Sequence, residues 1–172
     1  MSGVAKFVLS NWPVVARFEI IRRAYLSVEG QPVVALPEFA LNRRELVTLY
    51  RGMQLIRALD RKAVALQRTG GLGTYAVALG QEAVQVGVAS AMRRDDVLFP
   101  TYRDNGALLW RGVSPEDILT YWGGDERGSL FHGSPVDFPI SIPVGSHAPH
   151  AASAMFQMRS KGRRAAFQIA SP

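Results

Sequence analysis

The sequence predicts an α/β fold that is rich in helix and has a few parallel strands. Three observations support this prediction. Apolar residues recur at helical intervals from Asn42 to Gly70, short apolar runs typical of buried strands occur at 96–100, 140–144 and 165–170, and helix-start signals lie between these runs. So few strands would leave exposed sheet edges, and we expect such a fold to depend on partners for stability.

The composition is that of one globular domain, because 48% of the 172 residues are hydrophobic and 20% are charged. The chain has 20 Lys and Arg against 14 Asp and Glu, which gives a net charge of +6. This charge indicates phosphate-bearing ligands or acidic protein partners. No basic run alternates with aromatic residues, so we expect no nucleic-acid binding.

The sequence contains no cysteine, which excludes disulfides, thiolate catalysis and cysteine-ligated metal sites. The first residues carry only a short apolar run, which is interrupted at Asn11 and Pro13. We therefore expect neither a cleaved signal nor a membrane span, and we expect a cytoplasmic location.

We expect two regions, an extended arm at residues 1–41 and a partial domain at residues 42–172. The arm mixes short apolar runs with proline and glycine, so we expect it to lie on another surface. Asn42, followed three residues later by Glu45, is a helix N-cap signal for the long amphipathic helix. We interpret the polar side chains of that helix, including Asp60, as a solvated or interface face.

Further helices are predicted at 81–92, after 105, at 114–122 and from about 145. The first is rich in Ala and Val and contains Gly87, which predicts deep burial beneath a strand at 96–100. Ser114 followed by Pro115 is a strong start signal for the third helix. Residues 123–139 contain many glycines and prolines and are predicted to be a loop.

Tyr102 and Arg103 lie where the apolar run 96–100 gives way to a new helical pattern. An arginine keeps its charge at any working pH, and its planar fork matches phosphate oxygens. From spacing alone, two interpretations remain open: Arg103 binds an anionic ligand, or it pairs with a carboxylate beneath a loop.

Several short motifs occur in the order and spacing of one enzyme family, over about residues 45–166. They are Tyr50-Arg51-x-Met53, Asp60, Gln67-Arg68-x-Gly70, Gly80-Gln81-Glu82-Ala83, Tyr102-Arg103 with Gly106, Arg111-Gly112, and Gly145-Ser146-His147-Ala148-Pro149-His150-Ala151. The chain thus resembles the alpha subunit of the thiamine diphosphate-dependent first component of 2-oxo acid dehydrogenases. The fold implied is the N-terminal part of a thiamine diphosphate-binding fold.

The resemblance implies oxidative decarboxylation of a 2-oxo acid, with acyl transfer to a lipoyl group. The runs 36–39 and 122–128 resemble bacterial pyruvate-type members most, and a branched-chain 2-oxo acid is the alternative substrate. Implied partners are a beta subunit, in an α2β2 assembly, and a lipoyl-bearing acyltransferase. The family's activating glutamate comes from the beta subunit, so no catalytic residue is assigned to this chain.

The resemblance also implies where thiamine diphosphate would bind. Arg103 would hold the diphosphate, Tyr102 would lie near the aminopyrimidine, and backbone groups of Ile142 and Val144 would contact the aminopyrimidine ring. For Ile142 and Val144, an ordinary strand-core role is compatible with these backbone contacts.

Some relatives hold potassium in the same loop, and the matching positions here are Ser141, Pro143, Ser146 and His147. His147 stands where those relatives have an amide side chain. We expect His132 to help order the loop before this segment and His150 to be partly buried.

The family's magnesium–diphosphate motif, Gly-Asp-Gly, should follow a strand placed like 165–170. Here the sequence continues only with Ser171 and Pro172, and no acidic residue follows Asp137. We therefore expect a fold that is incomplete at the C-terminus and negligible binding of thiamine diphosphate and Mg²⁺ by this chain alone. A fragment, a truncated gene product and a non-catalytic remnant that serves only for subunit interaction are the alternatives.

Overall fold

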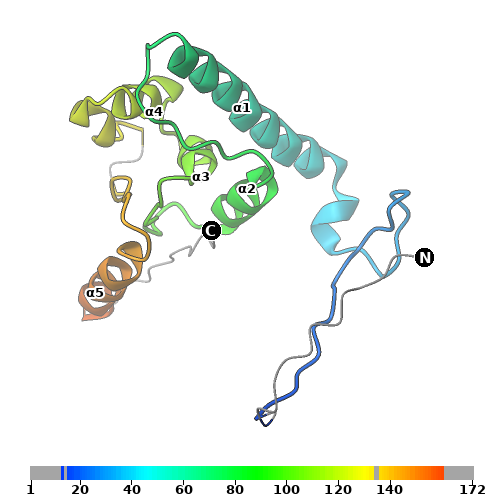
Figure 1. The fold of residues 1–172 in the computed structure, drawn as a ribbon. Helices are drawn as coiled ribbons and strands as arrows, with labels where there is room; N and C mark the ends of the chain where they lie inside the picture. Colours follow the sequence, from blue (N-terminus) through cyan, green and yellow to red (C-terminus); the bar gives the residue numbers. More distant parts are fainter. Residues whose placement is uncertain (1–12, 14, 134–135, 161–172) are drawn as a thin grey trace. The chain divides into compact units, whose positions relative to one another are not determined.

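The computed structural model describes residues 13, 15–133 and 136–160, and the described part is helix-rich (Figure 1). Its helices are α1 (Arg43–Arg68), α2 (Glu82–Ala91), α3 (Asn105–Trp110), α4 (Pro115–Trp122) and α5 (His147–Ser160), with the 3-10 helices η1 (Glu38–Leu41) and η2 (Glu126–Ser129). The chain divides into two units, residues 1–41 and 42–172.

The first unit has little secondary structure in its described residues. One antiparallel bridge joins Leu26 to Pro32 around a turn at Gly30, whose φ of +79° is readily adopted by glycine. Apolar side chains such as Phe18 and Ile20 are more than four-fifths exposed. This unit therefore lacks a packed core of its own in the described part.

Helices α1 and α4 begin where their capping residues predict. The Asn42 side chain accepts hydrogen bonds from the backbone N–H groups of Arg44 (3.1 Å) and Glu45 (3.3 Å). The Ser114 hydroxyl accepts one from the N–H of Asp117 at 3.0 Å. These caps satisfy donors that a helix leaves unpaired at its first turn, so local sequence sets both starts.

The main core lies where α2 and α3 pack against α1, beside α4 (Figure 1). It contains Ile56, Leu59, Ala78, Val86, Ala89, Leu98, Ala107, Leu108, Leu109, Val113, Ile118, Phe131 and Ile140. Gly106 allows this close packing, because a Cβ added at this position would lie 2.2 Å from Ile56 Cδ1 and 2.4 Å from Gln85 Oε1. Helix α3 can approach α1 and α2 only with glycine at this position.

The prediction that the helix at 81–92 is deeply buried is wrong, because α2 buries one face only. Glu82, Gln85, Val86 and Ala89 are buried, whereas Val84 is 57% exposed. A Cβ at Gly87 would meet nothing within 4 Å, so this glycine does not mark a close backbone approach.

The predicted strands at 96–100 and 140–144 are not seen as strands in the described residues. The two segments do lie side by side: Phe138 N–H donates to Leu98 O (2.9 Å), Ser141 N–H donates to Pro100 O (3.3 Å), and Thr101 and Ser141 form one parallel bridge. Pro100, Pro139 and Pro143 have no N–H to donate, which interrupts a regular ladder. The third predicted strand, at 165–170, lies outside the described residues.

Candidate functional site

The candidate site is formed where the segment ending in Tyr102 and Arg103 meets the segment that leads into α5. A tight turn holds the first segment, because the Asp104 carboxylate oxygen Oδ2 accepts from Thr101 N–H (2.8 Å) and from the Thr101 hydroxyl (2.9 Å). Asn105 then begins α3. The turn places the Arg103 side chain at the junction between an extended segment and a helix, as the sequence predicts.

The half-buried Arg103 side chain is held by the backbone before α2. Its Nη1 donates to Val77 O at 2.8 Å, and its guanidinium lies 5.3 Å from the centre of the Tyr102 ring. The Arg103 carbonyl accepts from the Gln85 side chain at 2.8 Å. No ion pair of Arg103 is found among the described residues, so the alternative of an arginine–carboxylate pair is not seen there.

Asp104 is fully buried beside these residues, and its second oxygen, Oδ1, has no hydrogen-bond partner in the described part of the chain. Burial raises the pKa of Asp104, although the hydrogen bonds from Thr101 and the electrostatic influence of the nearby His147 act in the opposite direction. The turn beneath Arg103 is thus built on a carboxyl group whose ionised form is disfavoured by its surroundings.

Ile142 and Val144 are 48% and 75% exposed. An ordinary strand-core role for these two side chains is therefore wrong for the described structure. The bridge between Thr101 and Ser141 places their segment beside the one that carries Tyr102 and Arg103.

The structure brings together three of the four residues matched to the potassium site. The Ser141 and Ser146 hydroxyls contact each other, and the Ser146 hydroxyl donates to Pro143 O at 2.8 Å. Such oxygen donors suit a hard cation. His147 fits less well: it is only 4% exposed, and neither ring nitrogen has a hydrogen-bond partner in the described ranges, but it offers nitrogen rather than oxygen.

The other histidines are placed differently from one another. His132 is mostly exposed, with Nδ1 3.6 Å from Asp117 Oδ1, a contact consistent with a role in ordering the loop. His150 is exposed, so the prediction of partial burial is wrong. The buried positions of α5 are His147 and Ala151, one turn apart, and His150 lies off that face.

A buried polar network, which the sequence interpretation missed, lies on the inner side of α1. Asp60 is 6% exposed, so placing it on a solvated or interface face was wrong. Its carboxylate accepts from the Tyr75 hydroxyl (2.8 Å) and from Ala78 N–H (2.9 Å). Asn105 donates to the same hydroxyl at 3.3 Å and accepts from Trp122 Nε1 at 3.4 Å. Helical spacing alone could have indicated the position of Asp60, because Ile56, Leu59 and Ala63 flank it on the buried face.

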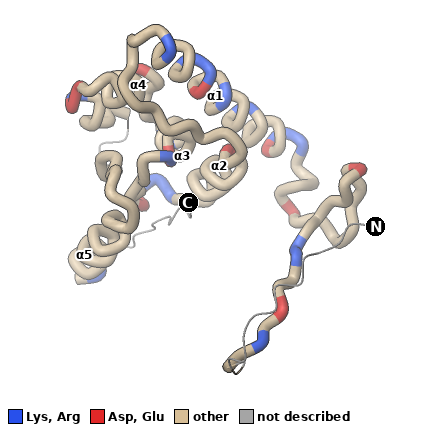
Figure 2. The backbone as a smooth tube through the Cα atoms, viewed as in Figure 1, with Lys and Arg blue, Asp and Glu red and all other residues tan. Residues whose placement is uncertain are grey.

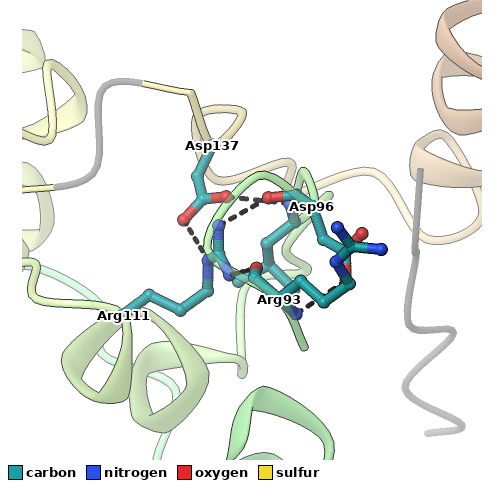
Figure 3. Close-up of polar contacts among 5 residues, drawn as sticks. Arg93, Asp96, Arg111 and Asp137 are labelled. Carbon is teal, nitrogen blue, oxygen red and sulfur yellow. Dashed lines mark hydrogen bonds and ion pairs between the residues drawn. The ribbon is translucent and has the colours of Figure 1, made fainter. Parts of the chain in front are cut away.

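The second missed feature is a buried ion pair between Arg111 and Asp137, at 2.6 Å between Nε and Oδ2 (Figure 3). It joins the end of α3 to the loop before Ile140. Arg111-Gly112 is one of the motifs that carry the family resemblance, but the motif does not identify the partner of Arg111, which lies 26 residues away in sequence.

Comparison with known proteins identifies the family to which this chain belongs. Residues 50–169 match the dehydrogenase E1 component family. Because this match covers more than half of the chain, the protein belongs to that family.

The individual relatives are bacterial proteins named as alpha subunits of 2-oxo acid dehydrogenases. The chain is 35% identical over 133 residues to "Pyruvate dehydrogenase E1 component subunit alpha" of Mycoplasma genitalium, covering 77% of this chain and 37% of the relative. It is 38% identical over 135 residues to the protein of the same name from Acholeplasma laidlawii, covering 78% and 39%. It is 42% identical over 106 residues to "3-methyl-2-oxobutanoate dehydrogenase subunit alpha" of Mycobacterium tuberculosis, covering 62% and 29%. The chain thus spans about two fifths or less of the length of these relatives.

Proposed function

We propose that this chain contributes one side of a thiamine diphosphate site in an E1 alpha subunit, which carries out oxidative decarboxylation of pyruvate with acyl transfer to a lipoyl group. The observation that carries the proposal is the placement of Arg103. One of its nitrogens is fixed on Val77 O, while Nε and Nη2 make no hydrogen bond within the described ranges. An arginine anchored in this way is oriented before a diphosphate arrives, which lowers the entropy lost on binding.

The contributions of the other predicted residues follow from their positions. Tyr102 stacks beside the Arg103 guanidinium and would border the aminopyrimidine side of the cofactor. Ile142 and Val144 would offer backbone groups, and their exposed side chains leave space beside that backbone. In the complete subunit, the segments 96–100 and 140–144 would be neighbouring parallel strands. Thiamine diphosphate, when bound, supplies the electron sink for decarboxylation.

Potassium is proposed for the three oxygens of Ser141, Pro143 and Ser146, which already lie together. His147 does not complete this set as an oxygen donor, so a bound potassium ion would need a further oxygen from water or from another part of the subunit.

The proposed partners are a beta subunit, in an α2β2 assembly, and a lipoyl-bearing acyltransferase. Apolar side chains on the unit 42–172 support protein contacts, because Tyr50, Val84, Val144 and Phe156 are all more than half exposed. Within the described ranges, every helix is too short or too polar to span a lipid bilayer.

Two alternative functions are also proposed. A branched-chain 2-oxo acid is the alternative substrate, because the Mycobacterium tuberculosis relative is 42% identical over its shorter match. A non-catalytic subunit-interaction module is the other. The Gly-Asp-Gly motif does not occur among these 172 residues. For that reason the chain alone is expected to bind thiamine diphosphate and Mg²⁺ negligibly.

A chimera tests the proposal. Residues 50–169 would replace the matching residues of the Mycoplasma genitalium alpha subunit, and the product would be made together with a beta subunit and titrated with thiamine diphosphate and Mg²⁺ by calorimetry. We expect stoichiometric binding by the chimera, none by the 172-residue chain alone, and faster turnover of pyruvate than of 3-methyl-2-oxobutanoate. An assembled chimera that binds no cofactor would favour the interaction module, and the opposite substrate preference would favour the branched-chain alternative.

A further inference from the structure

Arg111 lies directly after α3, and its guanidinium is engaged through three nitrogens (Figure 3). Nε donates to Asp137 Oδ2 (2.6 Å), Nη2 donates to Asp96 O (2.6 Å), and Nη1 reaches Arg93 O at 3.3 Å. The side chains of Arg111 and Asp137 are 7% and 0% exposed. Burying these charges is tolerated because each is paired and hydrogen-bonded, and the forked guanidinium joins three stretches of chain at once.

The Asp137 carboxylate extends this connection to the next segment. Its second oxygen, Oδ1, accepts from Leu98 N–H at 2.8 Å. One residue further on, Phe138 N–H donates to Leu98 O at 2.9 Å, and then Ser141 N–H donates to Pro100 O at 3.3 Å. The ion pair therefore lies at the start of the short run of hydrogen bonds that pairs the two extended segments.

Besides these hydrogen bonds, the rings of Phe99 and Phe138 contact each other across the two segments, with centroids 4.2 Å apart. Proline at 100, 139 and 143 removes donors from the pairing, and no strand is formed along either segment in the described residues. A slip by one residue would turn the side chains of an extended segment to the opposite face. Beyond this point the first segment carries Tyr102 and Arg103, and the second carries Ile142 and Val144.

We propose that Arg111, acting through Asp137, is a positioning residue that fixes the alignment of segments 96–104 and 137–146 and thereby sets Arg103 opposite the backbone at 142–144. The significance of this alignment for cofactor binding rests on the proposed function, but the alignment itself can be measured without any cofactor.

A depression of about 540 Å³ lies beside Arg111 and is lined by Met92, Trp110 and Val136 among others. If Arg111 is shortened to alanine, the vacated space is continuous with this depression, so a small guanidinium ion in solution can enter and pair with Asp137. Arg57 provides the matched control, because its Nε also pairs with a carboxylate, Glu82, at 2.8 Å, but its side chain is 48% exposed and lies on α1.

The experiment measures amide hydrogen exchange of the full 172-residue chain, as wild type, Arg111→Ala, Arg111→Lys and Arg57→Ala. In Arg111→Ala, the amides of Leu98, Phe138 and Ser141 should exchange about tenfold faster or more, as expected when a buried group loses its partner. The exchange rates of amides in the middle of α1 should change less than about twofold.

Ethylguanidinium at low millimolar concentration should restore protection at the amides of Leu98, Phe138 and Ser141 in Arg111→Ala, whereas ethylammonium chloride at the same concentration should not.

Arg111→Lys keeps the charge but cannot reach three acceptors, so it should show the same local pattern in weaker form. Arg57→Ala should leave the three amides unchanged. The proposal is overturned if Arg111→Lys raises exchange equally in α1 and in the three amides, or if the three amides stay protected in Arg111→Ala. If Arg111→Ala unfolds the whole chain, Arg111→Lys decides between these results. Failure of the chimera to bind cofactor would contradict the proposed function and leave the exchange result standing.

Discussion

At the scale of single residues, the main feature is that buried polar side chains are joined to one another by hydrogen bonds. Asp60, Tyr75, Asn105 and Trp122 join α1, the segment before α2, α3 and α4 through side-chain hydrogen bonds. Burial, together with the neighbouring Asp60, raises the pKa of Tyr75 well above its ordinary value. The hydroxyl therefore stays protonated and donates to Asp60 at neutral pH.

Tyr75→Phe tests this network directly. The change removes one hydroxyl and leaves a buried oxygen of Asp60 without its donor, so we expect the free energy of unfolding to fall by about 1–3 kcal/mol. Urea unfolding measures the loss. Tyr50→Phe is the control: Tyr50 lies on α1 and is 58% exposed, so the free energy of unfolding should change by no more than about 0.5 kcal/mol. Equal effects of the two substitutions would show that the buried network contributes nothing.

Asp60 should also give stability a measurable pH dependence. Burial raises its pKa in the folded protein, although hydrogen bonds from Tyr75 and Ala78 act against this. The folded state therefore binds the proton more tightly than the unfolded state, whose pKa is about 3.9. As the pH rises from about 4 through the raised pKa of folded Asp60, the free energy of unfolding of wild type should fall relative to that of Asp60→Asn. Above the folded pKa, the difference between the two proteins should stay constant. Urea unfolding of both proteins between pH 4 and 8 measures this difference in the free energy of unfolding. If wild type became more stable relative to Asp60→Asn as the pH rose, the raised pKa of Asp60 would be contradicted.

At the scale of elements, α3 depends on a close approach to its neighbours. Gly106→Ala would place a methyl group against Ile56 and Gln85, at 2.2 and 2.4 Å from their side-chain atoms. We expect a loss of about 1–3 kcal/mol, because core packing must shift to accommodate the methyl group. Gly87→Ala in α2 is the matched control, since nothing lies within 4 Å and alanine favours the helix by about 0.5–1 kcal/mol. Thermal unfolding compares the two, and a neutral Gly106→Ala would show that α3 can move away from α1.

The sequence predicts the helices well because their starts depend on neighbours in the chain. Asn42 and Ser114 cap backbone groups two or three residues away, so a local pattern is sufficient to locate them. The extended segments depend on pairing across some forty residues, and the prolines within them remove donors that a strand pattern assumes. Local apolar runs therefore predicted strands where the described part of the chain has a single parallel bridge.

In the candidate site, too, features set by neighbouring residues could be predicted from the sequence, whereas features set by distant contacts could not. The position of Arg103 at a junction between an extended segment and a helix could be predicted from the sequence, because the junction itself is local. Its anchor on Val77 O, the burial of His147 and the pairing of Arg111 with Asp137 could not, because each depends on a contact between distant stretches of chain. The exposure of the Ile142 and Val144 side chains could not be predicted for the same reason.

At the scale of the whole molecule, positive charge is concentrated along α1 (Figure 2). The helix carries Arg43, Arg44, Arg51, Arg57, Arg61, Lys62 and Arg68 against Glu45 and Asp60. No aromatic residues alternate with these charges in the way that single-stranded nucleic acids require. We therefore expect no measurable DNA binding at 50 mM salt, as judged by fluorescence anisotropy; binding at 50 mM salt that is lost steeply by 200 mM would indicate a phosphate-binding surface instead.

The central claim is that Arg103 forms part of a diphosphate site, and its substitution in the chimera tests this most directly. Arg103→Gln removes the charge and leaves a shorter polar side chain, so calorimetry should show affinity for thiamine diphosphate reduced by about tenfold or more, as expected for loss of a charge-assisted hydrogen bond. Arg61→Gln, an exposed arginine of α1, should bind like the unsubstituted chimera. Equal affinity of the Arg103→Gln and unsubstituted chimeras would contradict the account.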